Sequence, residues 1–146
     1  MLDFLLPEGL LFRSVSRSGD EYAILSGKEC LGMPMAVLVN DATYSAAEFF
    51  AAALREYDWA TIVGSHTPGK GYSQATFVLS DGSAMALSTK TYYTPKGEYL
   101  EGVGLEPDVV LDLNEDDYIS LYYGVLPAEE DPQLQKAVEA VLQPEK

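Results

Sequence analysis

A β-α-β unit between residues 35 and 64 is the feature that most constrains the fold. Residues 35–39 form a continuous apolar run, which is typical of a buried parallel strand. Residues 45–57 place apolar side chains at helical spacing, and residues 60–63 form a second apolar run closed by Gly64. Because two parallel strands need a long crossover connection, the pattern predicts neighbouring parallel strands joined by a helix with a right-handed crossover.

Two antiparallel hairpins are expected around this unit. Residues 10–16 and 21–25 are strand-like and are separated by a polar turn, which predicts the first hairpin. Residues 74–79 and 84–93 flank the dipeptide Asp81-Gly82, a strong signal for a tight turn. Each hairpin can form one side of an antiparallel sheet.

The rest of the chain adds a short strand and a helix. Residues 109–111 are apolar and β-branched, and a terminal helix is expected from Asp131 to Leu142, with Pro132 at its first position. A length of 146 residues corresponds to one domain. The sequence therefore predicts a single compact α/β domain.

The charge of the chain excludes several classes of partner. The formal net charge is −14, and eleven acidic residues with no basic residue lie between Lys96 and Lys136. This balance argues against nucleic acid and against anionic lipid, since both need clustered Lys and Arg. The acidic stretch is interpreted as a solvated face, because it contains no calcium-binding loop pattern. No apolar run is long enough to span a membrane.

Neither a metal nor a cofactor is indicated by the residue pattern. Cys30 is the only cysteine, so zinc-ligand spacing is absent, and its flanks carry no cysteine-protease signature. It is interpreted as an ordinary thiol. The only histidine, His66, leaves no usable Ser-His-Asp set and is expected at the surface.

Ser45 stands where a strand and a short loop lead into the central helix. A helix N-terminus offers free N–H groups, so the N–H of Ala46 could hold an oxyanion formed at Ser45. The same residues also admit an inert interpretation, because Ser45 and Glu48 have the spacing of a capping box. Glu48 is expected to cap the helix rather than to act as an acid.

Lys70 lies 25 residues after Ser45, between Gly69 and Gly71. To act as a base it must be neutral, whereas a free lysine has a pKa near ~10.4, so burial or nearby positive charge is required. The glycines would let the backbone pass closely enough to bury the stem. The alternative is a solvated turn lysine.

Together with its flanks, this pair resembles the carboxyl-terminal processing (tail-specific) serine peptidases, the S41-type family. The resemblance covers nearly the whole chain. It is carried by Val37-Leu38-Val39-Asn40 with Ser45-Ala46-Ala47-Glu48, by residues 62–74 with Gly69-Lys70-Gly71, by residues 79–84 and 92–97, and by residues 102–108 and 131–134.

The resemblance implies a set of roles and a fold. Ser45 would be the nucleophile, Lys70 the base, Gln74 an assisting residue that holds the lysine, and the N–H of Ala46 an oxyanion donor. The implied chemistry forms an acyl-enzyme without cofactor or metal. The implied fold is the crotonase/ClpP-like layered β-β-α spiral.

The resemblance also implies parts that this sequence does not contain. Residues 1–146 are expected to be a partial catalytic domain, because the family has an upstream segment that supplies a second oxyanion N–H and a PDZ module that captures substrate C-termini. Polypeptide substrates and an extracytoplasmic or membrane-associated location are expected for the full-length protein. Tyr44 departs from the Gly- and Ser-rich loop of the family and narrows the approach to Ser45.

Two other functions stay open at this stage. The first is a catalytically silent domain of the same fold that acts as a peptide- or ligand-binding scaffold, favoured by Tyr44 and by the missing upstream segment. The second is a crotonase-like acyl-CoA enzyme, which the acidic balance and the absence of Gly-rich oxyanion segments disfavour.

Overall fold

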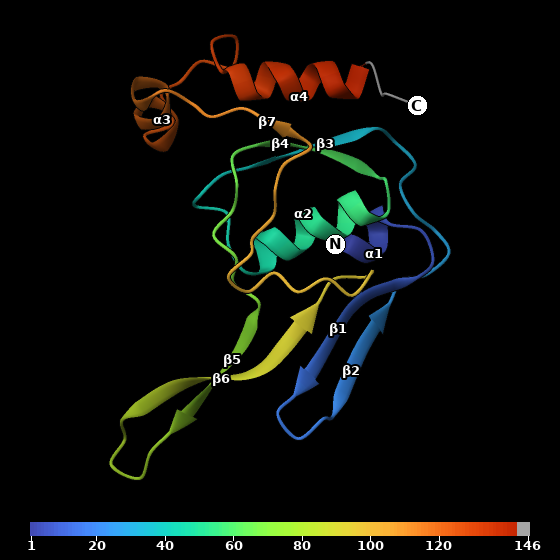
Figure 1. The fold of residues 1–146 in the computed structure, drawn as a ribbon, viewed down its shortest axis with the longest axis vertical. Coiled ribbons are helices and arrows are strands. Elements are labelled where there is room, and N and C mark those ends of the chain that lie inside the picture. The colour runs from blue at the N-terminus through green and yellow to red at the C-terminus, as the bar shows by residue number, and fades with distance from the viewer. Residues whose placement is uncertain (143–146) are drawn as a thin grey trace.

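A three-stranded parallel sheet lies between two helices in the computed structural model, which describes residues 1–142. The strands are β3 (Met35–Val39), β4 (Ala60–Gly64) and β7 (Val109–Val110), in the order β3-β4-β7. Helix α4 (Pro132–Leu142) covers one face of this sheet and α2 (Ala46–Glu56) covers the other (Figure 1). The predicted parallel β-α-β unit is thereby confirmed.

A second, antiparallel sheet lies on the far side of α2 (Figure 1). Its strands are β1 (Leu10–Ser16), β2 (Glu21–Leu25), β5 (Tyr72–Val78) and β6 (Ala84–Tyr93), in the order β2-β1-β6-β5. The β1–β2 and β5–β6 pairs are the two hairpins that the sequence predicts. Helix α2 is therefore enclosed between two sheets.

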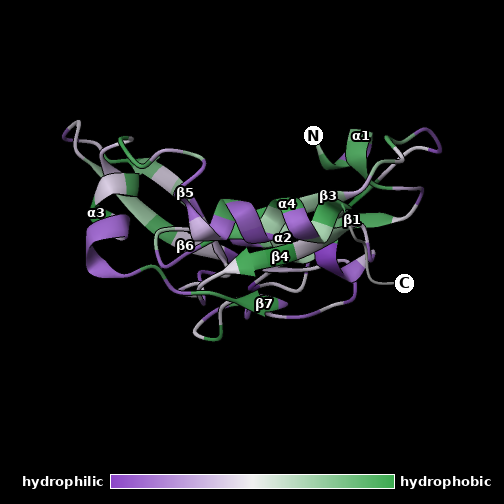
Figure 2. Ribbon diagram, turned by 90° about the horizontal axis from the view of Figure 1, so that it is seen from above, coloured by the Kyte–Doolittle hydropathy of each residue, from purple (hydrophilic) through white to green (hydrophobic). Residues whose placement is uncertain are grey.

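The sequence of α2 explains why it can pack on both sides. Phe49 and Leu54 are buried in a cluster with Leu11 and Tyr92, whose strands β1 and β6 belong to the antiparallel sheet. Ala51 and Ala52 are fully buried in a second cluster beside Val39 and Ile62 of the parallel sheet. The small alanine side chains allow the helix to approach that sheet closely, and Figure 2 shows β4 as a hydrophobic strand next to α2.

Two helices were not predicted. Helix α1 (Leu2–Leu5) is a single turn, and α3 (Glu115–Tyr122) begins in the run of acids that was interpreted only as a solvated face. Asn114 caps α3, because its side chain accepts the backbone N–H of Asp117 at 2.9 Å. Acids in the first turn also suit the positive end of the helix dipole. Among the residues described, no helix combines the length and apolar character needed to cross a bilayer.

Candidate active site

The backbone at Ser45 has an uncommon conformation. Its φ of 60° and ψ of −120° are rare for a residue with a side chain, and Asp58 is the only other non-glycine residue with positive φ among residues 1–142. The loop from β3 is ordered before it, since Asn40 N donates to Thr43 Oγ1 and Ala42 N donates to Asn40 Oδ1, both at 3.0 Å. Strain of this kind clusters at functional sites and is maintained only by surrounding contacts.

Glu48 supplies those contacts. Its side chain is fully buried, and Oε2 accepts the backbone N–H of Ser45 at 2.8 Å and that of Lys70 at 2.9 Å. Oε1 accepts the Thr67 hydroxyl at 2.6 Å and the Gly69 N–H at 2.7 Å. The capping box that the sequence predicts is present, but only its Glu48 half has hydrogen-bond geometry. One carboxylate thus joins the serine loop to the lysine loop.

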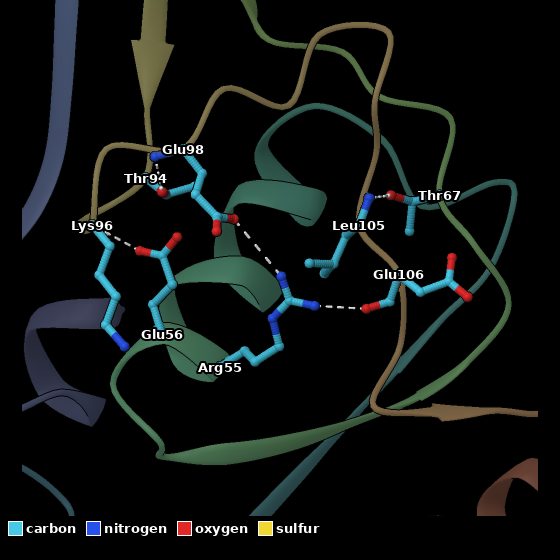
Figure 3. A network of polar contacts seen from close by, with 8 residues as sticks. All are labelled: Arg55, Glu56, Thr67, Thr94, Lys96, Glu98, Leu105 and Glu106. Carbon is cyan, nitrogen blue, oxygen red and sulfur yellow. Dashed lines mark hydrogen bonds and ion pairs between the residues drawn. The ribbon is translucent and has the colours of Figure 1, made fainter.

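The lysine loop is also held from its other side. Thr67 Oγ1 accepts the backbone N–H of Leu105 at 2.8 Å, as Figure 3 shows. A Cβ on Gly69 would lie 2.5 Å from Gly104 N, so only glycine fits at this approach. Glu101 accepts the N–H of Gly71 at 2.6 Å. The loop is therefore fixed between α2 and residues 100–105.

The C-terminal end of α2 fixes the flanks of that segment. Arg55 donates to the Glu106 carbonyl at 2.6 Å and approaches the Glu98 carboxylate at 3.9 Å, and Glu56 Oε2 accepts the Lys96 N–H at 2.7 Å (Figure 3). Both ends of α2 therefore position residues 94–106, which in turn support the lysine loop.

Tyr92 reaches the same place from β6. Its side chain is 6% exposed, and its phenol donates to the Lys70 carbonyl. Burial raises the pKa of Tyr92, a hydrogen bond with the Ser45 side chain opposes that rise, and the charge of Glu48 adds to it. The phenol therefore stays protonated and acts as a donor at neutral pH.

The predicted side chains are brought together only in part. The Ser45 and Lys70 backbones meet at Glu48, but no hydrogen bond joins Ser45 Oγ to Lys70 Nζ in the part of the chain that is described. Instead, Nζ lies 5.7 Å from the centroid of the Tyr44 ring. Gln74 is exposed on β5, and its side chain makes no hydrogen bond to Lys70. Ala46 is exposed at the first position of α2, where its N–H has no partner within the helix.

Sequence reasoning missed two residues of this site. Glu48 was predicted as a local cap, and its bonds to the lysine loop depend on tertiary structure that its spacing from Ser45 does not reveal. For Tyr92, the alternation of Tyr92 and Tyr93 along a strand predicted only that one ring faces inward. That prediction is confirmed, because Tyr92 is buried and Tyr93 is partly exposed. His66 is exposed as predicted and lies 3.7 Å from the Glu106 carboxylate.

Two clefts flank the candidate site. One of about 240 Å³ lies at the carboxyl ends of the parallel strands, where Asn40, Asp41, Ser65 and Tyr118 contribute to its lining. Another of about 750 Å³ lies at the opposite end of α2 and includes Trp59. Within residues 1–142, no group of three or more His, Cys, Asp or Glu side chains is arranged to hold a metal ion.

Comparison with known proteins gives consistent relatives. The sequence model of peptidase family S41 matches residues 1–111. A carboxyl-terminal-processing protease of Synechocystis is 38% identical over 108 residues, which is 73% of this chain and 25% of that protein. A probable CtpA-like serine protease of Staphylococcus aureus is 34% identical over 116 residues, or 77% of this chain and 23% of that protein.

Solved structures agree with this assignment. A photosystem II D1 C-terminal processing protease superposes with a TM-score of 0.67 at 32% identity, covering 97% of this chain and 34% of that one. A structure described as a peptidase from Parabacteroides merdae gives a TM-score of 0.69 at 18% identity, covering 97% of this chain and 45% of that one, which supports the fold alone. The chain spans about a quarter of the curated relatives it matches. On the family match over residues 1–111, the chain belongs to peptidase family S41.

Proposed function

We propose that this chain carries the nucleophile and the base of a serine endopeptidase that cleaves proteins near their C-termini. The observation that carries the proposal is the double role of Glu48, whose Oε2 accepts the backbone N–H of both Ser45 and Lys70. A buried carboxylate at this junction keeps the two loops in a fixed relation. Family membership and the backbone of Ser45 support the same reading.

The proposed reaction is an acyl transfer. Neutral Lys70 takes the proton of the Ser45 hydroxyl while Oγ attacks the peptide carbonyl carbon. The tetrahedral intermediate collapses, the C–N bond breaks, and the Lys70 ammonium gives its proton to the leaving amine. Water then attacks the ester, Lys70 accepts a proton from that water, and the acid product and free Ser45 are released.

The remaining roles follow from position. The N–H of Ala46, at the exposed N-terminus of α2, would stabilise the oxyanion. Gln74 would hold Lys70 during turnover, which requires its exposed side chain to move toward the lysine. We propose further that the two sheets and α2 are part of the crotonase/ClpP-like layered β-β-α spiral expected for the family.

Substrates and setting are proposals for the whole protein. The names of the Synechocystis and D1-processing relatives describe C-terminal processing, which suits polypeptide substrates here. In the full-length protein we expect an upstream segment that completes the oxyanion hole, a PDZ module that selects substrate C-termini, and an extracytoplasmic or membrane-associated location.

A second candidate function is supported by one observation. Lys70 Nζ lies over the Tyr44 ring and forms no hydrogen bond with Ser45 Oγ, which is what a catalytically silent, peptide-binding domain of the same fold would also have. The two functions differ in whether Ser45 reacts.

Covalent labelling separates the two functions. The longest natural chain that contains this sequence is treated with a fluorophosphonate, and the modified peptide is identified by mass spectrometry. The peptidase proposal expects one adduct, on Ser45, that Ser45→Ala abolishes and Ser73→Ala leaves unchanged. A folded protein that gives no adduct on Ser45 would support the silent domain.

A further inference from the structure

Tyr44 has a position that the proposed reaction does not use. It immediately precedes Ser45, and its ring lies under the ammonium of Lys70, with 5.7 Å between Nζ and the ring centroid. The side chain is 58% exposed, so packing does not lock it in place. A distance within about 6 Å is the range in which a cation is attracted to the face of an aromatic ring.

We propose that Tyr44 is a positioning residue for Lys70, and the inference rests on the proposed function. In the resting protein the ring holds the protonated ammonium, so Lys70 is charged and directed away from Ser45 Oγ. A polypeptide that binds at Ser45 displaces the exposed ring, and Lys70 is then released toward the hydroxyl. The resting site is thereby protected from reaction in the absence of substrate.

The backbone around Lys70 favours a movement of the side chain alone. Its N–H is bound to Glu48 and its carbonyl accepts the Tyr92 phenol, so both sides of the residue are fixed. The loop cannot shift without breaking these bonds, whereas the four-carbon stem can rotate between the ring and the serine. Two positions of Nζ on one fixed backbone make a simple switch.

The chemistry of the ring sets which form it holds. The negative face of an aromatic ring attracts the charged ammonium and gives no comparable attraction to a neutral amine. The other titratable groups near the backbone of residues 70–71 are Glu48 of α2, Tyr92 of β6, and Tyr99 and Glu101 of the segment that follows β6. All four are unchanged when Tyr44 alone is replaced, so a change in pH dependence reports the ring.

The kinetic test compares Tyr44→Leu with Tyr44→Phe, since leucine removes the aromatic face and phenylalanine keeps it. The rate of Ser45 labelling by a fluorophosphonate is measured from pH 5 to pH 10. On the acid side of the profile, Tyr44→Leu is expected to react about two- to fivefold faster, with its acid limb moved to lower pH, because an exposed cation–π contact has that strength. Tyr44→Phe should follow the wild type. Equal rates and profiles for all three proteins would overturn the inference.

An independent measurement requires no reaction. A ring over Nζ shifts the NMR signals of the Lys70 ε-methylene protons upfield, and these signals are identified by their loss in Lys70→Arg. The upfield shift should persist in Tyr44→Phe and vanish in Tyr44→Leu. If the shift is absent from the wild type, the inference fails even when Ser45 is labelled. If Ser45 is never labelled while the shift behaves as expected, the peptidase proposal fails instead.

Discussion

The carboxylate of Glu48 accepts the backbone N–H of Lys70 at 2.9 Å, although the two residues belong to different elements and lie 22 positions apart. The same oxygen accepts the N–H of Ser45. The α2 helix therefore does more than present a serine at its N-terminus. It also carries, one turn further on, the group that fixes the lysine loop.

Replacing Glu48 tests this connection. Glu48→Gln leaves a single acceptor oxygen where four donors converge, and buried donors without partners cost about 1–3 kcal/mol each. We expect the free energy of unfolding in urea to fall by at least about 3 kcal/mol. The control is Glu115→Gln, an exposed residue at the start of α3, which should change stability by less than about 0.5 kcal/mol. Similar losses for both variants would contradict the account.

Gly69 provides a test of the lysine loop itself. Gly69 and Gly82 have nearly equal positive φ, 81° and 85°, but a Cβ at Gly69 would meet Gly104 N at 2.5 Å whereas one at Gly82 would meet nothing within 4 Å. Gly82→Ala should therefore cost only the backbone strain, about 1–2 kcal/mol. Gly69→Ala should cost clearly more in urea unfolding. Equal costs would mean that the close approach to residues 100–104 does not matter.

The sequence predicted most of this fold because apolar runs and turn residues act locally. The bounds of β1, β2, β3 and β6 coincide with the predicted ranges, and α4 lies within its predicted range. Residues such as Met35 to Val39 have a single reasonable interpretation, since five consecutive apolar residues between polar loops fit only a buried element.

The candidate site was predictable only in its residue types. The backbone of Ser45 depends on a loop closed by Asn40 and Thr43, and neither residue signals a positive φ three to five positions later. The bonds from Gly69 and Lys70 to Glu48 join segments about twenty residues apart. The position of Lys70 over Tyr44 likewise depends on tertiary structure, and the assisting role of Gln74 stays a prediction.

The strained backbone of Ser45 leads to a comparison of two variants that both lack the hydroxyl. Glycine adopts positive φ readily, whereas alanine keeps the Cβ that makes φ of 60° unfavourable. We expect Ser45→Gly to be about 1 kcal/mol more stable than Ser45→Ala by thermal unfolding, after the larger chain entropy of glycine is allowed for. If the alanine variant is the more stable of the two, the strain at this position is absent in solution.

Tyr92 predicts a dependence of stability on alkaline pH. Burial raises the pKa of its phenol in the folded chain, so the folded state retains a proton that the unfolded state loses near pH 10. The stability that this group contributes is present below pH 10 and declines as the pH rises toward the folded value. Tyr92→Phe should therefore show a smaller loss of melting temperature between pH 9 and pH 11 than the wild type. An identical slope for both proteins would argue against the buried phenol.

The most direct test of the account is whether the reactivity of Ser45 depends on Lys70. The rate of fluorophosphonate labelling at Ser45 is compared in the wild type, in Lys70→Met, which keeps the length of the stem without the amine, and in Lys96→Ala, an exposed lysine outside the site. We predict that Lys70→Met lowers the rate at least 100-fold, the scale of a lost general base, while its melting temperature and the rate in Lys96→Ala stay close to the wild type. A folded Lys70→Met protein that labels Ser45 at the wild-type rate would contradict the assignment of Lys70 as the base.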